Sequence, residues 1–184
     1  MIRGGRPASR SKSGGDLLSK RAKYGLKALV RLAEVWPAGP ILIAELARDE
    51  RIPLKFLENI LLRLKQAGYL ASKKGRGGGY SLATAPDRVM VGDVVRLLDG
   101  PLALVPCASL TAYRPCSDCA DESACGIRSI MKEVRDVTAA ILDRTSLDDL
   151  RARERRGGRR PAMAPERGAR AVRGIQRGGS RGSR

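Results

Sequence analysis

Residues 43–82 read IAELARDERIPLKFLENILLRLKQAGYLASKKGRGGGYSL, and this stretch decides the fold. Apolar residues recur at helical spacing over Ile43–Asp49 and again after Pro53, whose fixed φ suits the first turn of a helix. A tight turn separates the two segments, and the second one ends near Gly68. Two short helices joined by a tight turn predict a helix-turn-helix unit.

The rest of this stretch predicts a β-hairpin. Residues 69–74 form the outgoing strand, residues 75–79 the glycine-rich tip and residues 80–82 the returning strand. The hairpin carries three basic residues, which are Lys73, Lys74 and Arg76. A basic hairpin directly after a helix-turn-helix is typical of a wing that contacts phosphate or a minor groove.

The second helix carries the candidate DNA-reading residues on its polar side. They are Lys55, Glu58 and Asn59. Its N-terminus favours phosphate, and a carboxylate in the major groove can accept a hydrogen bond from cytosine N4. The alternative is a scaffold without DNA contacts. Residues 20–76 hold thirteen basic and five acidic residues, a net charge of +8, which favours DNA binding over that alternative.

Helical spacing predicts further elements on both sides. A first helix starts after an N-cap at Ser19 and stops before the turn at residues 37–40; another covers residues 91–98. A long helix over Gly126–Leu142 carries an apolar stripe of Ile127, Ile130, Met131, Val134, Val137, Ile141 and Leu142. Such a stripe suits a dimer seam, although it would also fit a core within one chain. We therefore predict a mainly α fold with a small β-hairpin wing: a winged helix-turn-helix plus a long dimerisation helix.

Composition sets the limits of this architecture. The 184 residues carry a formal charge of +17, with 42% hydrophobic and 3% aromatic residues, so one aliphatic and mainly helical domain with tails is expected. We divide the chain into a disordered basic N-terminal extension (1–15), a winged helix-turn-helix domain (16–104), a cysteine-rich sensor loop (105–126), a dimerisation helix (127–148) and a disordered Arg/Gly-rich tail (149–184).

Several function classes are disfavoured. The chain has no run of about 18 apolar residues and no apolar signal-peptide region, which predicts no membrane partner and a cytoplasmic location. It has no histidine and no phosphate-cradling loop, so we expect no enzyme and no small-molecule substrate. The rival of another class is a general nucleic-acid-binding protein, driven by salt-sensitive contacts of the basic tails.

Four cysteines fall within nineteen residues, with eight, two and five residues between neighbours. They are Cys107, Cys116, Cys119 and Cys125. Thiols this closely spaced, in a chain without a secretion signal, fit a metal or cluster better than disulfides. Thiolates are the natural ligands of iron–sulfur clusters, and four of them also fit tetrahedral zinc, although zinc sites usually have two C-x-x-C pairs and this chain has one. A metal-free loop with structural or switching thiols is the third alternative.

Six short segments resemble the Rrf-two winged-helix regulators. They are residues 23–29 (KYGLKAL), 53–58 (PLKFLE), 66–70 (QAGYL), 75–80 (GRGGGY), 91–95 (VGDVV) and 99–102 (DGPL). The family includes iron–sulfur regulators of the IscR, NsrR and RirA types and the cluster-free cysteine regulator CymR. The resemblance covers about residues 17–145 and implies a homodimer, crossed through the long helix at 126–142, that binds a roughly palindromic double-stranded DNA operator. It also implies base discrimination by Glu58 and minor-groove entry by Lys74, with Arg76 beside it.

The resemblance further implies an iron–sulfur cluster that senses iron, redox state or NO. A [2Fe-2S] cluster is the expected form and [4Fe-4S] the alternative, with zinc less favoured; the implied ligands are Cys107, Cys119 and Cys125. This chain departs from the ligand pattern of the family at two positions. IscR-type members supply a histidine where this chain has Arg128, and NsrR-type members use an acidic residue at about the position of Lys23, although Asp16 lies nearby. Cys116 adds a fourth thiolate, so one subunit can supply complete cysteine ligation.

Overall fold

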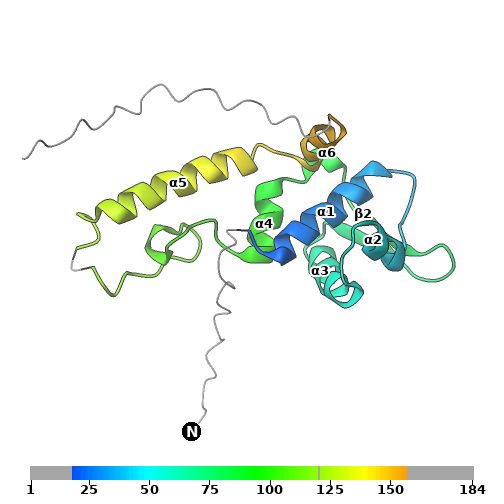
Figure 1. The fold of residues 1–184 in the computed structure, drawn as a ribbon, viewed down its shortest axis with the longest axis horizontal. Helices are drawn as coiled ribbons and strands as arrows, with labels where there is room; N and C mark the ends of the chain where they lie inside the picture. Colours follow the sequence, from blue (N-terminus) through cyan, green and yellow to red (C-terminus); the bar gives the residue numbers. More distant parts are fainter. Residues whose placement is uncertain (1–17, 120, 157–184) are drawn as a thin grey trace, which may run out of the picture.

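The computed structural model describes residues 18–119 and 121–156, which form a winged-helix body with one long helix beside it (Figure 1). The elements in chain order are α1 (Lys20–Glu34), α2 (Ile43–Asp49), α3 (Leu54–Gln66), β1 (Leu70–Lys73), β2 (Gly79–Leu82), η1 (Pro86–Arg88), α4 (Val91–Asp99), η2 (Pro106–Ala108), α5 (Gly126–Leu142) and α6 (Leu147–Arg155). The predicted mainly α class with a small hairpin is confirmed. The expected extension at 1–15 lies outside the described residues, and no helix within them is long and apolar enough to span a membrane.

The centre of the body is α1, which packs against α3, α4 and α6. Ser19 caps it as predicted, because the Ser19 side chain accepts a hydrogen bond from the Ala22 N–H. The largest fully buried side chains are Leu29, Leu32, Leu46, Leu57, Ile60, Leu61, Leu64, Leu147, Val89 and Val94. This aliphatic core packs α3 against α1 and α2 against α3, and so fixes the direction of α3.

The helix-turn-helix consists of α2 and α3, joined by a turn with one unusual residue. Arg51 has φ +54°, a left-handed conformation that costs a residue with a Cβ atom roughly 1–2 kcal/mol. The turn is closed by the Ile52 N–H, which donates to the Ala47 carbonyl at 2.9 Å. Ile52 is buried, so α3 starts from a fixed point.

The wing is an antiparallel hairpin in which Leu70 pairs with Leu82 and Lys73 with Gly79. Its return strand is tied to the segment before α2, since Ile41 and Tyr80 exchange backbone hydrogen bonds of 2.9 Å. Gly79 is required there: its φ is +144°, and a Cβ atom would lie 2.2 Å from the Ile41 carbonyl oxygen. The wing therefore has a fixed base, while Lys73 at the end of β1 is exposed.

The long helix α5 runs beside the body, and the cysteine loop lies along its N-terminal half (Figure 1). Its bounds agree with the predicted helix 126–142, and none of its residues is buried. The predicted dimerisation segment 127–148 is too long, because α5 ends at Leu142 and residues 147–148 belong to α6. Near its C-terminus, Asp143 accepts two hydrogen bonds from Arg96 of α4, at 2.6 and 2.7 Å. This ion pair joins the end of α5 to the winged-helix body.

One prediction about the C-terminal region is wrong. The tail was expected to be disordered from residue 149, but α6 extends to Arg155. It starts with a capping box between Ser146 and Asp149, and Leu147 is fully buried in the core. Arg151 donates to the Ala33 carbonyl at 3.0 Å, which ties α6 to α1. Residues 157–184 lie outside the described residues.

Candidate functional site

The candidate reading residues lie together on the exposed side of α3. Lys55 pairs with Glu58 at 2.9 Å, and the Asn59 side chain donates to the Lys55 carbonyl at 3.1 Å. The hydrogen bond to Glu58 raises the pKa of Lys55, whose side chain is 89% exposed. The structure thus shows what sequence reasoning left out: Glu58 already has a cationic partner one helical turn away. A base or phosphate that binds either side chain must replace this ion pair.

The wing places its basic residues at an exposed tip. Lys73, Lys74 and Arg76 are all exposed, and β1 packs against α3. Lys65 near the end of α3 donates to Ser72 of β1 at 2.6 Å, so the helix and the wing are also joined by a side-chain contact. The arrangement offers a basic surface made of one helix and one hairpin, which suits a helix in a groove with a wing on the neighbouring backbone.

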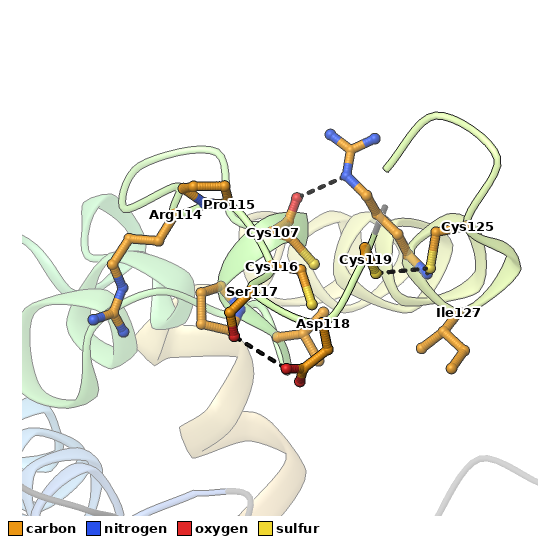
Figure 2. Close-up of a pocket in the computed structure, with 12 residues that line it drawn as sticks. Cys107, Arg114, Pro115, Cys116, Ser117, Asp118, Cys119, Cys125 and Ile127 are labelled. Atoms are coloured by element: carbon orange, nitrogen blue, oxygen red, sulfur yellow. Dashed lines mark hydrogen bonds between the residues drawn. The ribbon is translucent and has the colours of Figure 1, made fainter. Parts of the chain in front are cut away.

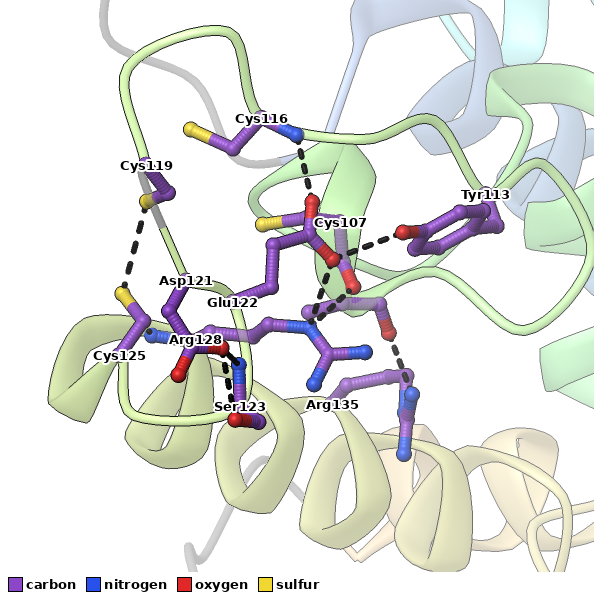
Figure 3. Close-up of polar contacts among 11 residues, drawn as sticks. Cys107, Tyr113, Cys116, Cys119, Asp121, Glu122, Ser123, Cys125, Arg128 and Arg135 are labelled. Carbon is purple, nitrogen blue, oxygen red and sulfur yellow. Dashed lines mark hydrogen bonds and ion pairs between the residues drawn. The ribbon is translucent and has the colours of Figure 1, made fainter.

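The four cysteines line one cavity of about 460 Å³ between the loop and the start of α5 (Figure 2). Cys107 is buried, and the other three are half-buried. Pro106, Arg114 and Arg128 also line this cavity. Figures 2 and 3 show the four sulfur atoms turned towards a common space. The structure therefore brings together all four thiols that the sequence predicted to act together.

Each end of the cysteine loop is held by a different contact. Cys107 lies in η2, and its carbonyl accepts a hydrogen bond from Arg128 Nε at 3.0 Å. Cys125 is the N-cap of α5, where its sulfur accepts from the Arg128 N–H at 3.5 Å. Between them, the Cys119 and Cys125 Sγ atoms lie 3.8 Å apart. The start of α5 thus depends on the same side chains that line the cavity.

Glu122 is the centre of the polar contacts in the loop (Figure 3). Its carboxylate accepts from the Cys116 N–H at 2.6 Å and from the Tyr113 hydroxyl at 2.7 Å, and it lies 3.6 Å from Arg128 Nε. The Cys116 N–H, followed by the Tyr113 hydroxyl, lowers the pKa of Glu122. Glu122 therefore connects the middle of the loop to Arg128 of α5, a role that the spacing of the sequence did not predict.

The Cys119 and Cys125 thiols differ in their titration. The Arg128 N–H, followed by the Cys119 thiol, lowers the pKa of Cys125. Hydrogen bonding with the Cys116 thiol, and next with Cys125, raises the pKa of Cys119 to about 12. A free N–H at a helix N-terminus stabilises thiolate, so Cys125 is the more readily ionised of the pair.

A second set of contacts holds η2 against α5. Arg135 donates to the Ala108 carbonyl, and its side chain is only 11% exposed although it lies on a helix without buried residues. Arg135 and Arg128 are seven residues apart and so share one face of α5. Sequence periodicity gave no sign of this role, because arginine on a helix is ordinarily a solvated residue.

Within residues 18–119 and 121–156, no three His, Cys, Asp or Glu side chains are placed to hold a single metal ion.

The apolar stripe of α5 is exposed in the single chain. Five of its seven members repeat every three and four residues and are exposed as follows: Ile127 69%, Ile130 48%, Val134 38%, Val137 61% and Ile141 52%. Met131 and Leu142 are half-buried. Such a 3–4 repeat is the pattern of a coiled-coil seam. The stripe is one continuous face of a helix, unlike the single exposed apolar residues of ordinary surfaces.

Comparison with known proteins gives one consistent family. Residues 18–153 match the family model Rrf2, described as iron-dependent transcriptional regulator. An rrf2-like HTH-type transcriptional regulator of Rhodobacter capsulatus is 45% identical over 139 residues, 74% of this chain and 93% of that protein. The structure of CymR, the global cysteine regulator of B. subtilis, has a TM-score of 0.62 at 30% identity and covers 73% of this chain and 95% of that one. T. potens IscR has a TM-score of 0.60 at 24% identity, with 80% and 93% covered, and so shows a shared fold.

Proposed function

The chain belongs to the Rrf2 family of transcriptional regulators, as its resemblance to the Rrf-two proteins predicted, and on this premise we propose that it is a homodimeric repressor or activator whose DNA binding responds to an iron–sulfur cluster in the cysteine cavity. Membership of the family also confirms the prediction that the protein is a regulator and not an enzyme. The observation that carries the proposal is the convergence of four thiols on one cavity of about 460 Å³.

The donor set fits such a cluster. Cysteine thiolates hold both [2Fe-2S] and [4Fe-4S] clusters, and the proposed ligands are Cys107, Cys116, Cys119 and Cys125. Two thiolates on one tetrahedral metal, with bonds of about 2.3 Å, lie about 3.8 Å apart. The Cys119 and Cys125 sulfurs have this separation, 3.8 Å. A [2Fe-2S] cluster takes two cysteines on each iron, so this close pair favours it over [4Fe-4S]. When bound, the cluster supplies a centre that reacts with oxidants and NO.

Two alternatives remain for the cavity. A tetrahedral zinc ion could use the same 3.8 Å pair and would make the loop structural, but the described residues place no third donor beside that pair, so zinc would require the other thiols to move. A metal-free loop would leave the thiols to act as a redox switch. Arg128 occupies the position of the IscR-type histidine, and it is held by the Cys107 carbonyl and by Glu122. A guanidinium cannot ligate a metal, so Cys116 is the natural fourth ligand in this chain.

The DNA contacts are assigned to α3 and the wing. We assign base or phosphate contacts to Lys55, Glu58 and Asn59 and backbone or minor-groove contacts to Lys73, Lys74 and Arg76. Lys55 and Glu58 already form an ion pair, so Glu58 meets the groove with its charge partly neutralised. This pairing lowers the repulsion between the carboxylate and the DNA phosphates, while one oxygen remains to accept from a cytosine amino group.

A second copy of the chain is the proposed cover for the exposed stripe of α5. The five apolar side chains repeat at 3–4 spacing over the whole helix, and a parallel or antiparallel copy of α5 would bury them against each other. A dimer of helix-turn-helix units also matches a palindromic operator with two half-sites. The proposed partners are therefore a second chain and a double-stranded DNA operator.

Contacts connect the cavity to α3 through α5. Cys125 caps the helix, Arg128 joins it to η2, and Asp143 joins its far end to Arg96 of the winged-helix body. Ligation of Cys125 and its neighbours fixes the start of α5 and with it the spacing of the two α3 helices. A change of operator affinity needs a difference of about 1–3 kcal/mol between the two states.

The test is purification of the full chain under nitrogen, with visible absorption and iron, sulfide and zinc content. Matched iron and sulfide with a visible spectrum support the proposal, and a zinc content of one per chain supports the structural alternative. A colourless, metal-free chain after attempted reconstitution contradicts it. Single Cys→Ser variants at each of the four positions should lower iron content, whereas Ser117→Ala, which alters a non-ligand lining residue, should not.

DNA binding is tested separately at fixed salt with specific and scrambled duplexes. Lys74→Ala should weaken both and reduce the salt dependence by about one ion, while Glu58→Gln should alter the preference among operators. Lys132→Ala removes equal charge from α5, away from α3 and the wing, and serves as the matched control. Equal losses for Lys74→Ala and Lys132→Ala would contradict the assignment of the wing.

A further inference from the structure

We propose that Cys119 and Cys125 form a reversible disulfide when the cavity holds no metal, which makes the start of α5 an oxidation site. The two Sγ atoms lie 3.8 Å apart. A disulfide bond is about 2.05 Å long, so the two sulfurs must move about 1.8 Å closer to each other. The bond closes a ring that runs from residue 119 to residue 125, within one exposed loop.

The pair is reachable by a small oxidant. Cys119 and Cys125 are half-buried and line the cavity, whereas Cys107 is buried. Three of the four residues 121–124 between them are exposed, so little packing opposes the movement. Figure 3 shows the two sulfurs facing each other across the loop. The Cys119 and Cys125 thiols are thus both open to a small oxidant and close to each other.

The other two cysteines are fixed to different groups. Cys107 belongs to η2, whose carbonyls are held by Arg128 and Arg135 of α5. The backbone of Cys116 is held by Glu122. Cys116 is the competing partner for Cys119, because the two form the C-x-x-C pair of the sequence. The Cys116 thiol also hydrogen-bonds with Cys119. We assign Cys125 as the partner because its sulfur lies 3.8 Å from Cys119, whereas the backbone of Cys116 is held by Glu122.

The reaction is ordinary thiol–disulfide exchange with a low-molecular-weight disulfide as the oxidant. The Cys125 thiolate attacks one sulfur of the oxidant, its S–S bond breaks, and one thiol leaves with a proton. Cys119 then loses its proton and attacks the Cys125 sulfur of the mixed disulfide, which releases the second thiol. Two protein thiols are oxidised and one small disulfide is reduced to two thiols. The product is the same if Cys119 reacts first, because both thiols line the cavity and lie 3.8 Å apart.

The consequence for regulation rests on the proposed function. A disulfide between Cys119 and Cys125 removes two of the four proposed ligands, so an oxidised chain cannot take up the cluster until it is reduced. The disulfide also ties the loop to the N-cap of α5, which is the residue that starts the dimer helix. The site would then respond to thiol oxidation after the cluster has been lost.

The experiment uses the full metal-free chain, reduced, freed of reductant and exposed to glutathione disulfide under nitrogen. Digestion before aspartate and after arginine divides the loop into peptides 99–117, 118–120 and 121–128, so that Cys119 and Cys125 fall on different peptides. We expect loss of two of the four thiols and a mass that joins 118–120 to 121–128, both reversed by dithiothreitol. Cys116→Ser should leave this linkage intact, and Ser117→Ala is its control. Cys119→Ser should stop the reaction at the mixed disulfide on Cys125.

Three results would overturn the inference: a link from 118–120 to 99–117, a link between two chains, or four unreacted thiols. None of these results tests the proposal that the cavity holds a cluster, since the readout is a peptide mass of the metal-free chain. The consequence has its own readout. The oxidised chain should take up no iron or sulfide during anaerobic reconstitution, and reduction should restore uptake to that of the untreated protein. If the oxidised chain takes up as much iron and sulfide as the untreated protein before reduction, the disulfide does not block cluster binding.

Discussion

Replacing Val137 by glutamate should weaken the proposed homodimer by about thirtyfold or more. Full burial of a valine or isoleucine side chain contributes about 1.5–3 kcal/mol. Val137 is 61% exposed in the single chain, so its burial in a seam contributes roughly 1 kcal/mol per chain and about 2 kcal/mol per dimer. At about 1.4 kcal/mol per tenfold change, this loss alone raises the dissociation constant about thirtyfold. Two facing carboxylates add a desolvation cost.

The assay is sedimentation equilibrium over a range of chain concentrations at fixed salt. Ser129→Glu is the matched control, because it places the same carboxylate on an exposed α5 residue two positions from Ile127 and outside the 3–4 stripe. Circular dichroism of both variants checks that α5 remains helical. A dissociation constant for Val137→Glu within a few-fold of the control would refute the assignment of this face to the dimer.

Three further predictions concern the body of the fold. Arg51→Gly should raise the free energy of unfolding by about 1 kcal/mol in denaturant titrations, because the φ of +54° costs glycine nothing. Gly25→Ala should lower it by up to about 2 kcal/mol, since the new Cβ would lie 2.4 Å from the buried Leu98 Cδ1 and the higher helix propensity of alanine offsets about 1 kcal/mol of the overpacking cost. Asp143→Asn should lower it by up to about 1 kcal/mol near neutral pH, as expected for a partly exposed ion pair. The hydrogen bond from Arg96 lowers the pKa of Asp143 below its usual 3.8, so this contribution is complete well above pH 3.8 and is lost as the pH falls through the lowered value; a difference from wild type that does not shrink as the pH falls below 3.8 would contradict it.

Local signals predicted the parts of the fold that depend on neighbouring residues. The bounds of α2 and α5 and the Ser19 cap follow from apolar spacing and capping chemistry, and the structure reproduces them. The helix α6 was missed because its arginine-rich composition resembled a solvated tail. Ser146 and Asp149 carried a usable signal, a serine followed three residues later by an acid around an apolar residue. Its stability comes from Leu147 in the core, which a local pattern does not reveal.

In the candidate site too, local patterns predicted some features, while others depend on contacts between distant residues. Spacing predicted that the four cysteines act together, and the i, i+3 pair of Lys55 and Glu58 was readable from helical geometry. The roles of Glu122 and Arg135 were not readable, because they depend on the path of an irregular loop. Loop backbones without repeating hydrogen bonds are fixed by contacts between residues far apart in sequence. Such contacts leave no periodic trace.

Because α5 is attached at both ends, a movement of the cysteine loop changes the tilt of the whole helix. Its 17 residues span about 25 Å, with the cysteine loop at one end and the Arg96–Asp143 ion pair at the other. A displacement of about 2 Å at the loop end tilts a rigid rod of that length by about 5°. In the proposed dimer the two rods lie against each other, so the tilt changes the distance between the two α3 helices. On the proposed function, the state of the cavity would therefore set the gap between the two half-sites, and operators that differ only in spacer length should distinguish the cluster-bound from the cluster-free protein.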